Sequence, residues 1–501
     1  MYFTHRWLGI AGCVLFVLWF VSGLVMLHVR FPALTPQERL DGLGAFDPAA
    51  ATVAPQQALA ALGAAAAPAA PVAPVAPGMA GPRRMVLERL GGEAAGAVPR
   101  LVWRVLDARG GHHVVAASGD PSAVPSTDVP TSPGEAVAIA AAFGQAPAHF
   151  VETREDDPWT LPNANGFEQA RPLHRVALDD GAGTELYLSA RTGEVVRDTS
   201  AFERRWTVFG TLLHYYTYAP IRRHADLWRQ LVLWTSGLAM LSAASGLILG
   251  VLRVRLRGRY RSGAVTPYCG WMAWHHLLGL VGGVAILGWV FSGWFSMSPG
   301  GWLSHPAPAS RPALFGGAQA PLPHRLEVLR QLPASARPVK TVEVGWFAGR
   351  PTWTLVDAAG ERRAVDALDG RPVAVTLALL RGAVQAAYPG VPVAEVVLLT
   401  VPDRYWYGRH VSPVLPVWRI RLADPAGTWL HVDAVSGQLL GSSTADGRLK
   451  RWLFNGLHSL DLFPQLLKTP VWYTTMWLLS LAGLAVSVTG VVLGWRRLRP
   501  G

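Results

Sequence analysis

Residues 4–23 read THRWLGIAGCVLFVLWFVSG, and residues 274–293 read WHHLLGLVGGVAILGWVFSG. An offset of 270 positions aligns the two stretches, so that His5 faces His275 and both stretches end in the same Ser-Gly pair. Between these ends both stretches are apolar and contain glycine, as expected of a membrane-spanning helix that carries a polar residue near its start. The second half of the chain therefore repeats the first, membrane span included.

A second run of matches lies at an offset of 244 and extends over residues 175–250 of the first copy. It pairs His214 with His458. Two runs at constant offset indicate a duplicated unit of span, large loop and span. Because duplication places equivalent residues around a pseudo-symmetry axis, the paired histidines become candidates for shared sites.

The composition is that of a membrane protein, since 50% of the 501 residues are hydrophobic and the mean hydropathy is +0.24. Four apolar stretches can cross about 30 Å of hydrocarbon at about 1.5 Å per residue, namely residues 7–27, 231–252, 270–297 and 471–495. The first is long for a secretory signal and no small-x-small cleavage site follows it, so we expect a retained helix. The fold class predicted is an internally duplicated, α-helical membrane protein with four transmembrane helices in a lipid bilayer.

The net charge of +12 is concentrated in arginines beside the predicted spans. Arginines alternate along residues 253–261, between the second and third spans, and others lie at Arg6 and in residues 496–499. The positive-inside rule places these clusters in the cytoplasm, so both termini are expected inside and both long loops outside. We interpret the arginines as topology signals and expect no nucleic-acid binding. The two cysteines, Cys13 and Cys269, lie in or beside spans, so no disulfide framework is expected in the loops.

The predicted division of the chain follows the spans. It comprises residues 1–28 (first transmembrane helix), 29–200 (first external region), 201–256 (surface helix and second transmembrane helix), 257–269 (arginine-rich cytoplasmic loop), 270–298 (third transmembrane helix), 299–447 (second external region) and 448–501 (surface helix, fourth transmembrane helix and tail). Residues 49–82 are rich in alanine and proline and are predicted to form a flexible spacer.

Alternating patterns and turn residues predict small α+β units, two in each external region. The predicted strands are 101–106, 112–117, 174–178, 185–190, 341–344, 352–356, 417–422 and 428–434, and the predicted helices are 135–143, 326–331 and 377–387. Short amphipathic helices that end at proline, 202–218 and 449–463, are expected on the membrane surface.

Histidine is costly in a membrane helix, so histidines near the spans are candidates for a function. Neutral imidazole binds haem iron, and two imidazoles from different helices give a six-coordinate electron-transfer site. The repeat sorts the candidates into two pairs, His5 with His275 on the cytoplasmic side and His214 with His458 on the external side. Glycines close to the first pair would leave room for a flat macrocycle.

Other histidines remain as alternatives. His276 is next to His275, and because a helix turns about 100° per residue only one of the two should face the site. His28 has a serine at its repeat position and is a reserve ligand for the external site, whereas His224 is interpreted as an interfacial residue. A lone histidine at the end of a span is more often an interfacial residue than a ligand, so it is the pairing that favours ligation. The loop histidines are expected at the surface: His112, His113, His149, His174, His305, His324, His410 and His431.

The sequence lacks the short motifs that are typical of several classes of soluble enzyme. The sequence contains no phosphate-binding glycine loop, no His-Glu-x-x-His, no Gly-x-Ser-x-Gly and no Cys-x-x-Cys. The cytoplasmic loops are too short for a nicotinamide or flavin domain. Asp433 lies beside the turn of Val435, Ser436 and Gly437, and its carboxylate is expected to accept turn N–H bonds rather than to act in catalysis.

Four motifs carry a resemblance to a known family: residues 4–9 leading to Ser22-Gly23-Leu24, residues 274–279, residues 455–460, and residues 431–440. Together they resemble the PepSY-associated transmembrane helix family. Residues 431–440 look like the closing hairpin of a PepSY domain, and residues 187–196 are a weaker copy with Ser189 where aspartate is usual. The resemblance covers most of the chain except the Ala/Pro-rich spacer. It implies a multi-pass protein of the bacterial inner membrane with two periplasmic α+β PepSY-like regions.

Some members similar to this chain are haem-containing reductases of ferric siderophores. The resemblance therefore implies a di-haem electron conduit with two b-type haems. By position, His5 and His275 would be axial ligands of the cytoplasmic-side haem iron, and His214 and His458 of the external one. The acceptor implied is a ferric siderophore or another periplasmic electron acceptor, and the donor is quinol or a cytoplasmic reductase. The activity implied is that of a haem-dependent ferric-chelate reductase.

Two other functions are open from the sequence. PepSY domains elsewhere inhibit peptidases or bind partners, so the chain could be a cofactor-free membrane anchor that displays PepSY domains to a periplasmic partner. A transporter is disfavoured because the four spans contain no carboxylate. In a two-haem conduit the haem sites would lie near opposite faces of a hydrocarbon core about 30 Å thick. Trp19 and Trp289 lie between these faces and are candidates to shorten the distance over which electrons must pass.

Overall fold

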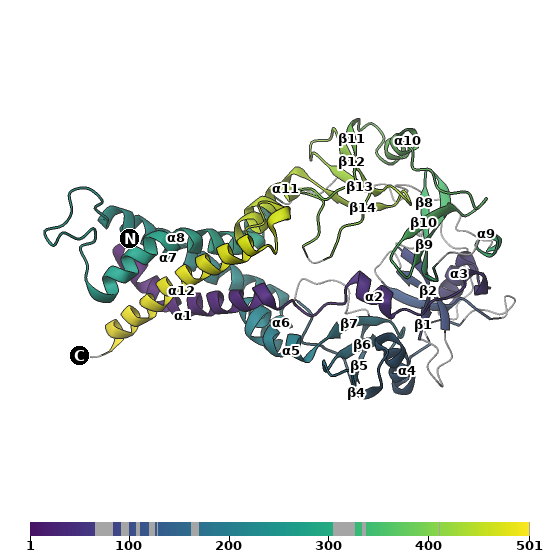
Figure 1. Ribbon diagram of the computed structural model, residues 1–501, viewed down its shortest axis with the longest axis horizontal. Coiled ribbons are helices and arrows are strands. Elements are labelled where there is room, and N and C mark those ends of the chain that lie inside the picture. Colours follow the sequence, from purple (N-terminus) through teal and green to yellow (C-terminus); the bar gives the residue numbers. More distant parts are fainter. Residues whose placement is uncertain are drawn as a thin grey trace.

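The computed structural model describes residues 1–65, 84–91, 100–106, 111–119, 126–127, 129–161, 170–303, 326–332, 337–409 and 411–499. Four long helices form an elongated stem, and three sheets lie beyond one end of it (Figure 1). Both chain termini lie toward the other end of the stem, which we call the tip. The place where the stem meets the sheets is called the junction.

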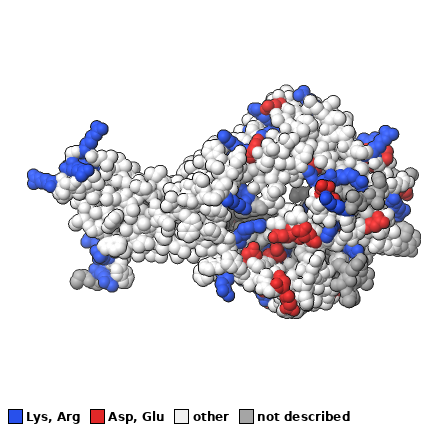
Figure 2. Space-filling model, in the orientation of Figure 1, with Lys and Arg blue, Asp and Glu red and all other residues white. Residues whose placement is uncertain are grey.

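The stem consists of α1 (Tyr2–His28), α7 (Ala225–Arg253), α8 (Gly270–Ser296) and α12 (Pro470–Leu498). Each of these helices is long and apolar enough to cross a membrane, which confirms the four predicted spans. Charged side chains lie at the tip and over the sheet-bearing end, and the stem surface between them is largely uncharged (Figure 2). The chain is therefore a multi-pass membrane protein.

The repeat determines how the four helices are arranged. Helix α1 packs against α7 and α12, and α8 packs against the same two helices, so α1 and α8 lie on one diagonal of the bundle. The offset of 270 relates α1 to α8, and the offset of 244 relates α7 to α12. A pseudo-two-fold axis therefore runs along the stem, and equivalent residues of α1 and α8 face each other across it.

Two of the sheets are copies of one α+β unit. The first lobe contains α4 (Pro133–Gly144) and the sheet β4 (Ala148–Arg154), β5 (Leu173–Leu178), β6 (Glu185–Ser189) and β7 (Val195–Thr199). The second lobe contains α10 (Leu377–Ala387) and the sheet β11 (Val393–Leu399), β12 (Val417–Leu422), β13 (Trp429–Asp433) and β14 (Leu439–Ser443). Within each lobe the helix packs its apolar side on the sheet, and all neighbouring strands are antiparallel.

The third sheet is shared between the two large loops. Its order is β10-β9-β8-β1-β2-β3, and the antiparallel pairing of β1 with β8 joins the loops. The strands are β1 (Arg84–Leu90), β2 (Arg100–Leu106), β3 (His112–Ala116), β8 (Val339–Phe347), β9 (Arg350–Asp357) and β10 (Arg362–Asp366). Trp103 and Trp353 stack in its core with ring centroids 6.1 Å apart. The unit predicted at the start of each external region is thus half of one common sheet.

Several short elements complete the fold. Before the shared sheet lie α2 (Pro36–Gly42), the 3₁₀ turn η1 (Pro48–Ala50) and α3 (Pro55–Ala65), and α9 (Glu327–Gln331) precedes β8. Helices α5 (Ala201–Thr207) and α11 (Ala445–Arg451) lead from the lobes toward the stem. Near the junction lie α6 (Ala219–Arg222) and the 3₁₀ turns η4 (Pro299–Gly301) and η6 (Pro464–Leu466).

Two further sequence-based predictions, on the spacer and on the loop histidines, are wrong in part. Residues 49–82 are predicted to be a spacer, yet Ala51 and Ala58 are fully buried in the core of the shared sheet; residues 66–82 lie outside the described part of the chain. His174 and His431 are predicted at the surface but are buried. His174 bonds to the Thr131 carbonyl and to the Thr153 hydroxyl, and Trp406 covers His431 by stacking on its ring. His305, His324 and His410 also lie outside the described residues.

Asp433 is a structural residue that ties the second lobe to the shared sheet. Its carboxylate is buried, accepts bonds from the Val435 N–H (3.1 Å) and the Ser436 hydroxyl (2.7 Å), and pairs with Arg362 of β10.

Asp433→Asn is expected to lower the free energy of unfolding by about 2 kcal/mol, because a hydrogen-bonded charge pair is lost. Denaturant titration followed by tryptophan fluorescence measures this loss. The first copy of the repeat has Ser189 at the position of Asp433, and Ser189 accepts bonds from turn N–H groups. Asp433→Ser should therefore keep turn bonds and, like Asp433→Asn, lose the ion pair. A wild-type midpoint in both variants would contradict the prediction.

Candidate functional site

Two cavities lie inside the stem, one at each end. The tip cavity has a volume of about 560 Å³ and is lined by side chains of α1, α7, α8 and α12, including His5 and His275. The junction cavity has a volume of about 380 Å³ and is lined by residues that include His214 and His458. Both volumes fall in the range of roughly 300–1,000 Å³ that small-molecule and cofactor sites occupy.

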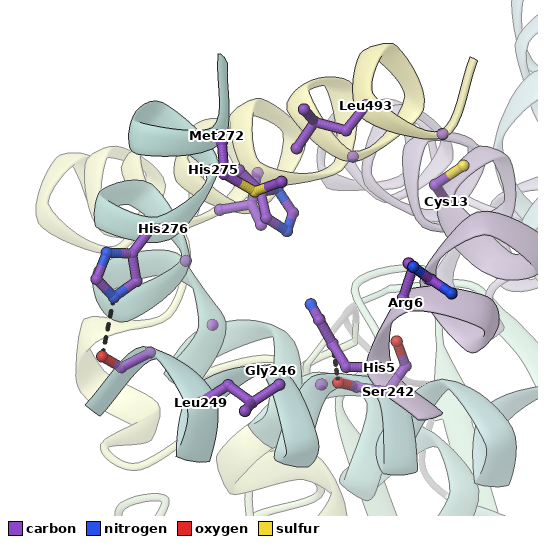
Figure 3. Close-up of a pocket in the computed structure, with 18 of the residues that line it drawn as sticks. His5, Arg6, Cys13, Ser242, Gly246, Leu249, Met272, His275, His276 and Leu493 are labelled. Atoms are coloured by element: carbon purple, nitrogen blue, oxygen red, sulfur yellow. Dashed lines mark hydrogen bonds between the residues drawn. The ribbon is translucent and has the colours of Figure 1, made fainter. Parts of the chain in front are cut away.

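The tip cavity contains the first predicted histidine pair. His5 comes from α1 and His275 from α8, and they enter the cavity from opposite sides (Figure 3). Their ring centroids are 6.1 Å apart and the ring planes are inclined by 33°. Because α1 and α8 lie on one diagonal of the bundle, the pseudo-two-fold axis passes between the two rings.

The junction cavity contains the second pair. The ring centroids of His214 and His458 are also 6.1 Å apart, and their planes are inclined by 79°. Each histidine lies two residues after the end of a π-helical turn, η3 (Val208–Leu212) or η5 (Trp452–Gly456), and the two turns are related by the offset of 244. These turns pack on α1 and α8, respectively. A π-helical turn re-aims the side chains after it, and such turns are frequent at functional sites.

Each junction histidine is held through its Nδ1 atom by a serine hydroxyl. His214 Nδ1 lies 3.0 Å from Ser22 Oγ, and His458 Nδ1 lies 3.0 Å from Ser292 Oγ. Both hydroxyls donate to the carbonyl three residues earlier on their helix, at 3.1 Å and 2.9 Å, respectively. A hydroxyl has one hydrogen, so each Oγ must accept from an Nδ1–H group. This fixes the tautomer that leaves a lone pair on Nε2.

The tip histidines are held in an equivalent way. His5 Nδ1 donates to the Ser242 carbonyl at 2.9 Å, and a carbonyl can only accept. His275 Nδ1 lies 2.9 Å from Thr489 Oγ1, which donates to the carbonyl of Val486 at 2.7 Å. Val486 is the repeat counterpart of Ser242. Within the described residues, none of the four paired histidines makes a hydrogen bond through Nε2.

The two alternative candidates lie in different surroundings. His276 is buried, donates from Nε2 to the Gly250 carbonyl (2.9 Å) and accepts at Nδ1 from the Thr266 hydroxyl (2.7 Å), so both ring nitrogens are engaged. His28 stacks on Tyr473 and accepts a bond from the Trp477 indole at 3.1 Å. It is not among the residues that line the junction cavity. The structure thus brings together the two repeat-related pairs and leaves His28 and His276 outside them.

The walls of the cavities carry cations and no counter-charge. Arg6, Arg253, Arg496 and Arg497 line the tip cavity, and Arg253 and Arg497 are repeat counterparts. No aspartate or glutamate lines either cavity within the described part of the chain. The sequence itself has no acidic residue in positions 227–326 or 462–501. A ligand with anionic groups would therefore meet unpaired guanidinium groups at the tip.

One layer of side chains separates the two cavities. Phe16 and Ile286 line both of them, and these residues are repeat counterparts at the offset of 270. On α1, His5 marks the level of the tip pair and Ser22 marks the level of the junction pair. These two residues are about 25 Å apart along the helix at about 1.5 Å per residue. The cavities extend from these two levels toward each other and meet at the shared layer. Trp19 and Trp289, expected from the sequence to shorten the gap, line the junction cavity.

The geometry suits a metal ion that needs two opposite nitrogen ligands. Among the described residues there is no group of three or more histidine, cysteine, aspartate or glutamate side chains that could hold a metal ion alone. Each cavity instead offers two imidazoles within a lining that is mostly apolar apart from its cationic and hydroxyl side chains. A metal ion bound by such a pair would need its remaining ligands from elsewhere, for example from a bound cofactor.

These features define a multi-pass membrane protein whose duplicated halves share two buried histidine pairs. The chain belongs to the PepSY-associated TM region family, whose model matches residues 2–497. The match covers nearly the whole chain and confirms the family expected from the sequence motifs. Among curated proteins, none matches this chain.

Proposed function

We propose that this protein is a di-haem electron-transfer protein of the bacterial inner membrane that passes electrons to a ferric chelate, such as a ferric siderophore, in the periplasm. The observation that carries the proposal is the geometry of the two histidine pairs. In each pair the rings face each other at 6.1 Å and are tethered through Nδ1, which leaves Nε2 free. Histidines that ligate metals characteristically use the second ring nitrogen in this way.

The spacing of the rings fits one iron between them. A metal–nitrogen bond to histidine is about 2.0–2.1 Å, and the centre of an imidazole ring lies roughly 1.2 Å from its nitrogen, so two opposed ligands place their ring centres about 6.4 Å apart. The observed separation of 6.1 Å is close to that value at both sites. His5 with His275 would hold the haem of the tip cavity, and His214 with His458 would hold the haem of the junction cavity.

The cavity walls also fit haem, which is flat, largely apolar and carries two carboxylates at one edge. At the tip, Arg253 and Arg497 lie on α7 and α12 as repeat counterparts, and neither has a carboxylate partner in the described structure. Bound haem supplies reversible one-electron chemistry at its iron. The paired histidines of this chain would hold that iron, and the Phe16–Ile286 layer would separate the two sites.

The direction of transfer follows from the arginines at the tip. If the positive-inside rule holds, the tip faces the cytoplasm and the sheets face the periplasm. Electrons would then enter the tip site from a cytoplasmic reductase or from quinol and leave from the junction site. A periplasm-specific reporter fused near Gly360 is expected to be active and one fused near Gly258 inactive. The reverse pattern would contradict the orientation of the conduit.

Electron delivery to ferric iron is testable directly. The purified protein, reduced anaerobically and freed of reductant, is mixed with ferric citrate and an Fe(II)-trapping dye. Each ferrous haem is expected to lose one electron and each chelated Fe(III) to gain one, so about two Fe(II) form per chain. Haems that stay reduced in the presence of ferric chelates would count against a ferric acceptor.

The adjacent histidines 275 and 276 should respond differently to substitution. His275→Ala is expected to abolish haem binding at the tip. His276→Ala should leave the haem content unchanged and lower the free energy of unfolding by about 1–3 kcal/mol, because its bonds to Gly250 and Thr266 are lost. Haem content per chain and thermal unfolding measure the two effects. Loss of tip haem in His276→Ala alone would reverse the assignment.

A second function is favoured by the outer strands of the lobes. Strands β4 and β11 lie at sheet edges and expose apolar side chains, among them Phe150, Val151, Val397 and Leu398. An exposed edge of this kind can pair with an extended peptide. The chain could therefore anchor PepSY-like lobes that bind or inhibit a periplasmic partner without a cofactor. A colourless purified protein would favour this function.

A further inference from the structure

The second lobe reaches into the stem through the connection between β11 and β12. Strand β11 ends at Leu399 and β12 begins at Val417, and within this connection Arg409 lines the junction cavity. Lys468, which lies just before α12, lines the same cavity. The second lobe thus contributes a residue to the wall of the junction cavity.

A buried ionic cluster holds this connection in place. Asp461 is completely buried and accepts bonds from Arg451 (3.0 Å) and from the Tyr407 hydroxyl. Burial and the neighbouring Asp461 carboxylate raise the pKa of Tyr407, so the phenol remains a donor. Tyr405 adds a second attachment, since its hydroxyl accepts a bond from the Trp452 indole at 3.0 Å.

The charges around this cluster do not balance. Asp461 is already paired with Arg451, and Arg409 lies farther away, with Nε 3.7 Å from Asp461 Oδ2. Lys468 has no ion pair in the described structure, and no acidic residue lines the cavity within the described part of the chain. Arg409 and Lys468 therefore border a largely apolar cavity. Asp461 is shared by Arg451 and Arg409, whereas Lys468 is exposed and has no carboxylate partner in the described part of the chain. A ligand in this cavity would meet these two cations and no carboxylate that lines the cavity in the described part of the chain, so an anionic group on the ligand is favoured there.

We propose that Arg409 and Lys468 form an anion-binding edge of the junction cavity that takes a carboxylate or a comparable anionic oxygen group. The inference rests on the proposed function. Such a group can come from two sources, the carboxylate edge of the haem between His214 and His458, or an anionic ferric chelate that docks against that haem.

The edge is one-sided, unlike the tip. At the tip the repeat counterparts Arg253 and Arg497 lie on both sides of the pseudo-two-fold axis. At the junction the repeat counterpart of Lys468 is His224, which is not among the cavity-lining residues. Both cations of the junction cavity thus belong to the second half of the chain. A ligand with one anionic edge is held there in a single orientation, with that edge toward the second lobe.

Three variants of the full-length protein test the proposal. Arg409→Gln and Lys468→Gln each remove one charge from the edge. Arg404→Gln is the matched control, because Arg404 belongs to the same connection but stacks on Phe463 and does not line the cavity. Arg409→Lys keeps the charge and should restore most of the lost effect. Circular dichroism of each variant checks that the lobes remain folded.

Two measurements distinguish the sources of the anion. In the first, haem-depleted protein is titrated with haemin and with haemin dimethyl ester, which lacks free carboxylates. If the haem supplies the anion, Arg409→Gln weakens haemin binding at the junction site by roughly tenfold or more and leaves the ester unaffected. In the second, the reduction of ferric citrate is compared with that of a cationic ferric chelate. If the chelate supplies the anion, KM rises by roughly tenfold for citrate only.

Either pattern supports the anion-binding edge and assigns its ligand. Haemin affinity and KM values in Arg409→Gln and Lys468→Gln that equal those of Arg404→Gln would overturn it, even in a protein that binds two haems. A chain that neither contains haem nor takes up haemin or its ester would overturn the proposed function itself, and the inference with it. The two failures therefore give different results.

Discussion

His458→Ala is expected to lower the haem content from about two to about one per chain, because the junction haem loses one of its two axial ligands. Adding His214→Ala should remove no further haem, since both substitutions affect the site in which these rings lie 6.1 Å apart. Adding His275→Ala to His458→Ala should instead remove the remaining haem. Haem per chain is measured as the pyridine haemochrome against protein concentration.

The double variants make this prediction specific. If His214→Ala/His458→Ala retained both haems, the junction site would be wrongly assigned, and His28 would be the next residue to replace. His28 also serves as a control. It bonds to Trp477 and is not among the cavity-lining residues, so His28→Ala should leave two haems in place.

Gly246→Ala is expected to impair the tip site as severely as the loss of a ligand. A methyl group at this position of α7 would lie 2.5 Å from Cε1 of His5, so the ring would have to move and lose its bond to the Ser242 carbonyl. Loss of such an orienting bond typically costs about 10–100-fold in metal affinity. The tip haem should therefore be lost on dilution or gel filtration, whereas the junction haem remains.

The repeat provides the control for Gly246. Gly490 is its counterpart on α12, and a methyl group there would lie 3.6 Å from Cε1 of His275, an ordinary contact. Gly490→Ala should therefore keep both haems. Both substitutions favour the helical conformation by about 1 kcal/mol, so helix propensity cannot explain a difference between them. Equal haem content in the two variants would show that His5 is not held as the structure indicates.

The parts of the molecule that follow from local pattern were predictable from the sequence. The four spans are apolar runs long enough for a bilayer, and the histidine pairs follow from two constant offsets between the halves. Helix α10 begins after Thr376, whose side chain accepts from the Leu379 N–H, and its predicted bounds match the structure. Each of these signals lies within a few residues or is repeated in register.

The parts that depend on distant contacts were not predictable. The pairing of β1 with β8 joins residues about 250 positions apart, as in the partners Leu87 and Val342, and no local pattern encodes it. The edge strands β4 and β11 were missed because apolar and polar residues do not alternate regularly along them. The alanines near Ala58 resemble a spacer by composition, although Ala51, Ala54 and Ala58 are buried in the core of the shared sheet.

The same limit applied within the candidate site. Sequence symmetry paired His5 with His275 but left His276 as an alternative, because the choice depends on what each ring nitrogen bonds to. Those partners, such as Thr489 on α12 and the Gly250 carbonyl on α7, lie on other helices. The π-helical turns before His214 and His458 likewise pack on the distant helices α1 and α8, and no local residue pattern predicts them.

The electronic spectra of the purified protein test the central claim most directly. We predict a Soret band, a b-type haem content of about two per chain and low-spin ferric iron with two imidazole ligands at each site. The ring planes are inclined by 33° at the tip and by 79° at the junction, so electron paramagnetic resonance should show two distinct low-spin signals. The junction signal should be the more anisotropic, because nearly perpendicular ligand planes leave two iron d orbitals close in energy. A colourless protein that takes up no haem would contradict the claim and leave the membrane anchor as the function.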